Sequence, residues 1–176
     1  MTEKVIIGGS GGQGIMLLGK VLAEAAMREN RHVTWLPAYG AEVRGGTAYC
    51  MVVISDGEIG SPYIDKADVL IIMNEPSLNK FQKRITGKGI LIINSSLVHR
   101  KEDSKAGQLS QPFTDIAAKM GNIKIANMIA LGYYISIKNI VKKETVFKVM
   151  HDIAPAGKQQ LIEINKKALE EGMALK

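Results

Sequence analysis

The chain has 176 residues, of which 46% are hydrophobic and 5% aromatic, and its formal net charge is +6. This length fits one domain over residues 1–176, and the apolar content excludes a disordered chain. The charge predicts a basic, solvated surface, with an acidic protein partner or a phosphorylated ligand as the open alternative. The sequence has no zinc-finger spacing, basic-region helix or aromatic RNA-binding strand, so no nucleic-acid partner is expected.

The single cysteine, Cys50, limits the redox chemistry of this chain. One thiol cannot form an internal disulfide or ligate an iron–sulfur cluster alone, and its apolar, strand-like flanks predict a buried structural thiol. Residues 2–4 do not begin a charged-then-apolar leader. No apolar run reaches the roughly 18 residues that a membrane-spanning helix needs. We therefore expect a cytoplasmic protein with no membrane partner.

The N-terminal part alternates short apolar runs with one helical pattern. Residues 4–8 predict a buried strand and residues 14–29 a helix. A second strand at residues 32–36 is expected to stop at Pro37. Together they predict a βαβ unit, parallel and right-handed.

The next connection is too short for another crossover helix. Residues 38–46 join the second strand to a strong strand at residues 47–55. Parallel neighbours need a dozen or more linking residues. The strand at residues 47–55 is therefore expected to run antiparallel to its predecessor or to lie at a sheet edge, which excludes a purely parallel sheet.

Apolar runs and caps predict the remaining elements. Pro76 is expected in the first turn of a helix, and Thr114 as the N-cap of another. The last third is nearly all helical, and it either packs on the sheet or protrudes to hold a partner. Its final helix carries an apolar stripe of Leu161, Ile164, Ala168 and Leu169. The expected strands are 68–73 and 89–94, with room for one more within 94–110, and the expected helices are 75–85, 114–120, 124–137, 143–152 and 154–173.

A glycine-rich loop joins the first strand to the first helix, in VIIGGSGGQGIMLLGKVLAEA at residues 5–25. Its glycines fit G-x-G-x-x-G in the context that gives the pattern meaning, because such a loop turns tightly and a helix N-terminus offers free N–H groups to an anion. The acidic residue that binds ribose is missing from residues 32–41, and no Gly-Lys-Ser/Thr closes the loop. Two interpretations stay open: a tight structural turn, or a site for an anion or carbonyl of a ligand or partner. The candidate residues here are Gly9, Gly11, Gly12, Gln13 and Gly14.

A second glycine-flanked loop lies in YGAEVRGGTAYC, residues 39–50. Glu42 and Arg44 either form a structural ion pair, or Arg44 offers its planar donor fork to a phosphate or carboxylate. Gly45 and Gly46 would let such a group approach the backbone. Both loops are expected near one end of the sheet, where open α/β folds bind ligands.

Other catalytic signatures are missing from the sequence. The histidines, His32, His99 and His151, lie in three different segments, so no metal site is expected. No G-x-S-x-G elbow occurs. Asp65, Asp68 and Glu75 flank the third strand and could act as acid–base groups, but Asp68 is expected to cap or solvate a strand end instead. No catalytic residue is assigned, which is typical of a subunit whose catalytic cofactors lie elsewhere.

Several stretches resemble the gamma subunit of 2-oxoacid:ferredoxin oxidoreductases. They are GGSGGQG at 8–14, YGAEVRGGTAYCMVVIS at 39–55, DVLIIMNEPSLNKF at 68–81 and IANMIALG at 125–132. The sequence looks most similar to the 2-oxoglutarate or branched-chain type, and the pyruvate type and the small subunit of indolepyruvate oxidoreductase share these signatures. The resemblance implies an α/β fold: three α/β/α layers, Rossmann-like but with a mixed sheet, and a helical C-terminal third.

The resemblance also implies a function. The complex would decarboxylate a 2-oxo acid, with 2-oxoglutarate expected, to an acyl-CoA and CO2 while reducing ferredoxin. Thiamine diphosphate, Mg2+ and [4Fe–4S] clusters would belong to alpha, beta and ferredoxin-like delta subunits, and coenzyme A would be a substrate. This chain alone would bind no cofactor and be inactive, and its two loops would face the alpha subunit or the coenzyme A phosphates. The alternatives are a stand-alone nucleotide- or small-molecule-binding protein and an NAD(P)-dependent enzyme.

Overall fold

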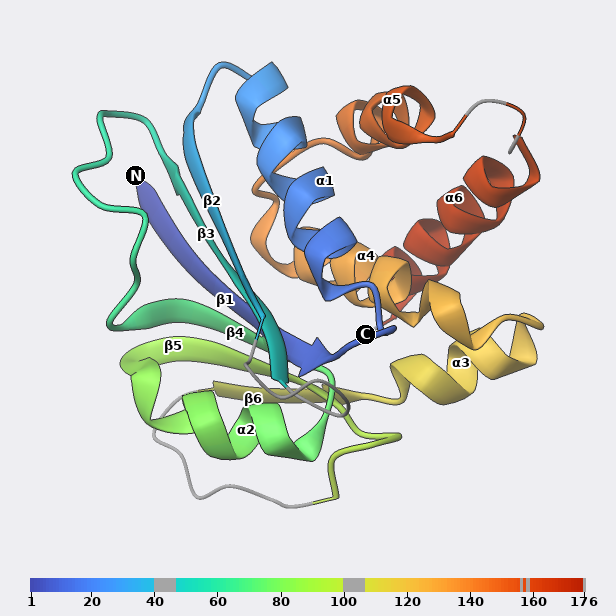
Figure 1. The fold of residues 1–176 in the computed structure, drawn as a ribbon, viewed down its shortest axis with the longest axis horizontal. Coiled ribbons are helices and arrows are strands. Elements are labelled where there is room, and N and C mark those ends of the chain that lie inside the picture. The colour runs from blue at the N-terminus through green and yellow to red at the C-terminus, as the bar shows by residue number, and fades with distance from the viewer. Residues whose placement is uncertain (40–46, 100–106, 156, 158, 176) are drawn as a thin grey trace.

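The computed structural model describes residues 1–39, 47–99, 107–155, 157 and 159–175 (Figure 1). Its strands form one sheet in the order β2-β3-β1-β4-β5-β6. The strands are β1 (Thr2–Ser10), β2 (His32–Tyr39), β3 (Thr47–Ser55), β4 (Ala67–Ile72), β5 (Ile85–Asn94) and β6 (Gly107–Gln111). The helices are α1 (Ile15–Arg28), α2 (Glu75–Phe81), α3 (Phe113–Lys119), α4 (Ala126–Lys138), α5 (Lys143–Ile153) and α6 (Gln159–Ala174), with short 3-10 turns η1 (Gln82–Arg84) and η2 (Ile123–Ile125).

The sheet is mixed because β3 lies between β1 and β2 and runs antiparallel to both. Strands β4, β5 and β6 continue from β1 in parallel. The predicted antiparallel direction of β3 is therefore confirmed, and the sheet edges are β2 and β6. β1 and β2 share a direction, as the predicted βαβ unit requires, but they are not neighbours because β3 separates them.

Strand β2 does not stop at Pro37, as the sequence predicts, but continues to Tyr39. Pro37 is in register with Cys50 of β3. Proline has no backbone N–H to donate to a ladder, so it is tolerated in a strand at the sheet edge. The edge position of β2 is the physical reason for the difference.

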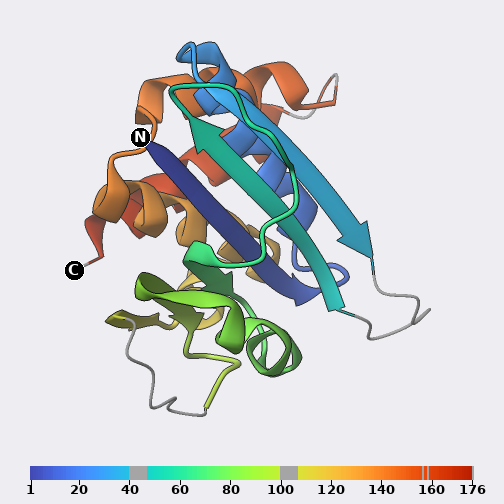
Figure 2. The same cartoon turned by 90° about the vertical axis from the view of Figure 1, so that its left-hand side faces the viewer.

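Apolar side chains alternate between the two faces of the sheet, as the strand repeat dictates. On β1, Val5 and Ile7 belong to one apolar cluster and Ile6 to the other. The first cluster packs against α1 and α3–α6, and the second against α2 and the segment that precedes β4. Figures 1 and 2 show α2 alone on its side of the sheet and the other helices on the opposite side. This arrangement confirms the three-layer α/β/α fold.

The C-terminal helices pack on the domain, which decides between the two alternatives left open by the sequence. α4 is buried over most of its length and lies between the sheet and α6. The predicted stripe on α6 is wrong at one position: Ala168 and Leu169 are fully buried, but Leu161 is 43% exposed and Ile162 is buried instead. α6 also begins later than predicted, at Gln159.

Two predicted helix ends are wrong. α3 begins at Phe113 with Pro112 in the N-cap position, and no side chain caps it. The Thr114 hydroxyl instead accepts a hydrogen bond from the Asn94 side-chain amide at 2.9 Å, so it is not available as the predicted cap. α2 has Pro76 in its first turn as predicted but ends at Phe81, after which the chain tightens into η1.

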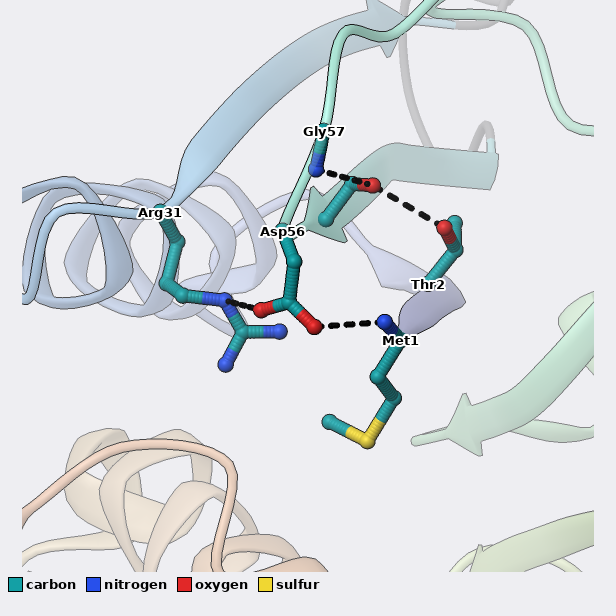
Figure 3. A network of polar contacts seen from close by, with 6 residues as sticks. Met1, Thr2, Arg31, Asp56 and Gly57 are labelled. Carbon is teal, nitrogen blue, oxygen red and sulfur yellow. Dashed lines mark hydrogen bonds and ion pairs between the residues drawn. The ribbon is translucent and has the colours of Figure 1, made fainter.

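A polar network joins the beginning of β1 to the end of β3 (Figure 3). The Asp56 carboxylate binds the amino group of Met1 and lies 2.8 Å from Nε of Arg31. These two positive groups, the amino group first, lower the pKa of Asp56. Beside it, the hydroxyls of Thr2 and Ser55 are 2.9 Å apart.

None of the helices in the described part of the chain combines the length and the apolar character that a membrane span needs.

Candidate functional site

The candidate site lies where the carboxyl ends of β1 and β4 meet. These strands are parallel neighbours, and the backbone N–H of Met73 donates to the Gly8 carbonyl at 2.8 Å. The chain leaves β1 for α1 on one face and β4 for α2 on the other. In open α/β sheets, a crevice forms at such a switch point and is the usual place for a ligand.

The predicted glycine loop occupies this switch point, and local geometry explains several of its glycines. A β-carbon on Gly9 would lie 2.6 Å from Cδ1 of Ile15, so the loop packs directly on the first turn of α1. Gly11 and Gly12 are exposed, and a β-carbon on either would meet no atom within 4 Å. Gly12 has a φ of 89°, a left-handed conformation that favours glycine. The loop therefore presents two bare peptide units to the outside.

The Gln13 side chain links the glycine loop to the end of β4 through hydrogen bonds. Its side-chain Oε1 accepts a hydrogen bond from the Ser10 N–H at 2.7 Å, and its Nε2 donates to the Met73 carbonyl at 3.2 Å. The carboxamide thus bridges the ends of both strands and already satisfies the Ser10 N–H. An incoming anion would therefore meet the exposed peptide units of Gly11 and Gly12 more readily than the Ser10 N–H.

The end of the loop is fixed by a residue 113 positions away in sequence. Gly14, with a φ of 69°, is the N-cap residue of α1, and its carbonyl accepts from Nδ2 of Asn127 at 3.1 Å. A β-carbon on Gly14 would lie 2.3 Å from that nitrogen. No described side chain caps α1 and its first turn carries no acidic residue, so the helix itself supplies no negative charge at its N-terminus.

Further polar side chains support the crevice and were missed in the sequence. Asn94 is fully buried; its amide donates to the Met73 carbonyl, and its Oδ1 accepts from the Thr114 N–H. The Ser77 hydroxyl on α2 donates to the Gly9 carbonyl at 3.3 Å. Asn127 had one available signal, because it is a lone amide within the apolar stretch IANMIALG.

Glu42, Arg44, Gly45 and Gly46 lie outside the described residues, so their proposed roles rest on the sequence. The residues on either side of that loop are placed: Thr47 is in register with Ser10, and Tyr39 with Ala48. The residues that flank the second loop therefore lie at the same end of the strands as Ser10 of the first loop.

The other candidates for chemistry have structural surroundings. Cys50 is buried against α1, and burial raises the pKa of its thiol to about 12. This agrees with the predicted structural thiol. The Asp68 carboxylate accepts the Lys4 N–H at 2.9 Å and Glu75 accepts the His99 N–H at 3.3 Å, as expected of groups that cap backbone ends. Within the described ranges, no three His, Cys, Asp or Glu side chains are grouped to hold a metal ion.

Comparison with known proteins defines the class of this fold and site. Residues 4–175 match the family described as pyruvate ferredoxin/flavodoxin oxidoreductase. The chain belongs to this family. The gamma subunit of a keto/oxoacid ferredoxin oxidoreductase from Geobacter sulfurreducens superposes with a TM-score of 0.83 at 27% identity, covering 97% of this chain and 95% of that one. The predicted fold and the resemblance to gamma subunits are thus confirmed.

Two curated relatives refine the comparison. The ketoisovalerate oxidoreductase subunit VorA of Methanothermobacter thermautotrophicus is 38% identical over 96% of this chain but only 35% of its own length. The 2-oxoglutarate synthase subunit KorC of Methanocaldococcus jannaschii is 32% identical over 91% of this chain and 88% of its own. This chain therefore spans about a third of the ketoisovalerate relative and nearly all of the 2-oxoglutarate one.

Proposed function

We propose that this chain is the gamma subunit of a 2-oxoacid:ferredoxin oxidoreductase complex. The complex converts a 2-oxo acid and coenzyme A to an acyl-CoA and CO2, and the electrons pass to ferredoxin. Family membership over residues 4–175 supports the class of enzyme. The observation on this chain that carries the proposal is the open glycine loop at the β1–β4 switch point, where the first turn of α1 carries no acidic residue.

The chain contributes a binding surface and leaves the redox chemistry to partners. Thiamine diphosphate with Mg2+ supplies the decarboxylation chemistry and [4Fe–4S] clusters the electron transfer, both in alpha, beta and ferredoxin-like delta subunits. The donor set here does not fit a cluster, because Cys50 is the chain's one cysteine and its thiol is turned toward the Ile15 carbonyl, 3.6 Å away. In this proposal the isolated chain is inactive. The assembled complex acts in the cytoplasm.

Coenzyme A is proposed to meet this chain at the two loops. The N–H groups of Gly11 and Gly12 and the α1 N-terminus suit a phosphate, and Arg44 supplies a planar donor fork. Glu42, Gly45 and Gly46 of the same loop complete the set of residues proposed for this contact. The rival occupant of the same loops is the alpha subunit itself.

The 2-oxo acid is proposed to be 2-oxoglutarate or a branched-chain acid such as ketoisovalerate, because relatives of both names match. Purifying the tagged chain from its own host tests the complex. Brown, cluster-bearing partners and CoA-dependent reduction of ferredoxin with one of these acids are expected. A chain that purifies alone and binds nucleotide would favour the stand-alone binding protein.

Calorimetric titration of coenzyme A into the assembled enzyme tests the loop contact. Losing a charged hydrogen bond costs about 1.5–3 kcal/mol, so Arg44→Ala should weaken binding by roughly tenfold or more. Lys148→Ala, on the exposed side of α5, is the matched control and should bind as the wild type does. Equal affinities in all three proteins would remove Arg44 from the site.

A further inference from the structure

The side of the domain that carries α2 has a cluster of positive side chains that form no ion pair with another described residue. Lys66 precedes β4, Lys80 lies on α2, and Lys83 and Arg84 form η1. The Lys66 ammonium donates to the backbone carbonyl of Lys83 at 2.8 Å, which fixes the Lys66 charge against η1. We call Lys66, Lys80, Lys83 and Arg84, with the Tyr63 ring beside them, the cationic face.

The positive groups of the cationic face rest on aromatic rings. The Lys80 ammonium lies 4.5 Å from the centre of the Tyr49 ring, and the Arg84 guanidinium lies 4.9 Å from that of Tyr63. Both also approach the buried Phe81 ring between them. These contacts hold the charges in place at the surface, and the Tyr63 side chain remains 58% exposed.

No ion pair with another described residue balances the charge of the cationic face. Ion pairs among the described residues lie at the beginning of β1 or on α1, α4, α5 and α6, and none involves Lys66, Lys80, Lys83 or Arg84. Asp65 is the one acidic side chain between Tyr63 and Lys66 in sequence, and its carboxylate is not within ion-pair distance of these groups. Three of the four cations are exposed, so the cationic face presents a net positive field to the outside.

We infer that the cationic face is a docking surface for a carboxylate-rich surface of another protein chain. Charge complementarity gives the sign of the partner, and an exposed tyrosine stacked with arginine is typical of the residues that anchor protein interfaces. Among the described helices, α2 packs on this face of the sheet, whereas α1 and α3–α6 pack on the other (Figure 1).

Binding of a simple polyanion tests the cationic face without any partner. In Lys80→Glu/Lys83→Glu two exposed charges are reversed, and Lys119→Glu/Lys124→Glu, with exposed lysines on α3 and η2, changes the net charge equally on the other side. At low salt, poly-L-glutamate should bind the wild type and the control alike and the first variant at least about tenfold more weakly. Unchanged thermal midpoints confirm folding. An equal loss in both variants would mean that only net charge matters and would overturn the inference.

Two further measurements complete the test. Single-stranded oligo-dT is the competing probe; if Lys80→Glu/Lys83→Glu weakens its binding but not that of poly-L-glutamate, the face is a nucleic-acid site and the inference is wrong. In the host, the control should retain its partner subunits and Lys80→Glu/Lys83→Glu should lose them. Retention by both overturns the inference and leaves the proposed function intact, on which the inference rests only for the identity of the acidic chain. A wild type without partners would contradict the proposed function, and the polyanion titration would still decide the cationic face.

Discussion

Gly132 of α4 and Leu169 of α6 are in direct backbone contact: a β-carbon built on Gly132 would lie 2.0 Å from the Leu169 carbonyl oxygen. The contact is reciprocal, because a β-carbon on Gly172 would lie 2.0 Å from the carbonyl oxygen of Ile129. Each helix therefore has a glycine that contacts a backbone carbonyl of the other helix, and on each helix this glycine lies about one turn from the carbonyl that the other glycine contacts. This close approach explains why a glycine is tolerated in the middle of a buried helix, where it costs about 0.5–1 kcal/mol relative to alanine.

Gly132→Ala should therefore destabilise the domain, against the usual gain from replacing glycine in a helix. The methyl group must push α6 away from α4, and overpacking of this kind costs about 1–3 kcal/mol. Urea unfolding followed by circular dichroism measures the change. Gly87→Ala in β5 is the control, because a β-carbon there meets no atom within 4 Å, so stability should be unchanged or slightly raised. A Gly132→Ala protein as stable as the control would contradict the tight helix contact.

The glycine loop offers a pair of substitutions that separate backbone strain from steric conflict. Gly12 and Gly14 both have positive φ angles, so an alanine at either costs about 1–2 kcal/mol. Only Gly14 has a neighbour in the way, Nδ2 of Asn127. Gly14→Ala should be more destabilising than Gly12→Ala, and the additional Asn127→Ala change should remove most of the difference. Equal effects of the two single substitutions in urea unfolding would rule out the contact with Asn127.

Cys50 should react with thiol reagents only when the protein unfolds. Its thiol is buried and has a pKa of about 12, so the thiolate fraction at pH 8 is about 10⁻⁴. The rate of labelling by iodoacetamide, followed by mass spectrometry, should match the rate of global unfolding. Ala118→Cys, on the exposed side of α3, adds an accessible thiol as a positive control and should be labelled at once. Fast labelling of Cys50 in the native wild type would contradict its burial.

The ion pair between Arg28 of α1 and Asp152 of α5 should give a small acid dependence of stability. Arg28 Nη1 lies 2.6 Å from the carboxylate and, together with His151, lowers the pKa of Asp152 below its ordinary 3.8. A carboxyl whose pKa is lower in the folded state stabilises the protein above the unfolded pKa, and this contribution disappears as the pH falls through the folded value. The loss is therefore expected below about pH 4.

Carbon-13 NMR titration of the carboxyl groups measures this effect directly. Arg28→Ala should raise the pKa of Asp152 toward 3.8, whereas Lys166→Ala, whose ammonium pairs with Glu163, should not. An unchanged Asp152 titration in Arg28→Ala would assign the low pKa to His151 alone.

Local sequence patterns predicted the elements that depend on local chemistry. The apolar run of β4, the glycine loop before α1 and the short connection before β3 were sufficient, because strand burial, turn geometry and connection length are properties of neighbouring residues. The antiparallel β3 followed from connection length alone. Strand direction also predicted that the residues flanking both loops lie at one end of the sheet.

The wrong predictions involve contacts between residues far apart in sequence. A proline usually ends a strand, but Pro37 lies on an edge strand, and only the full strand order shows which strands are at the edge. Thr114 has the chemistry of an N-cap, yet Asn94 on β5 engages its hydroxyl. Asn127 shapes the glycine loop from α4, and no local pattern connects it to Gly14. The site was therefore predictable in its backbone and not in the side chains that support it.

The side-chain NH2 group of Gln13 provides an NMR signal that should change when a ligand enters the crevice. The carboxamide oxygen occupies the Ser10 N–H and the carboxamide nitrogen the Met73 carbonyl, so a molecule that settles deeply between β1 and β4 has to displace the carboxamide. Displacement moves the side-chain NH2 resonances of a single glutamine, whereas a molecule held only at the outer peptides of Gly11 and Gly12 leaves them in place. Occupancy of the crevice, and its depth, can thus be read from two proton signals without any assay of turnover.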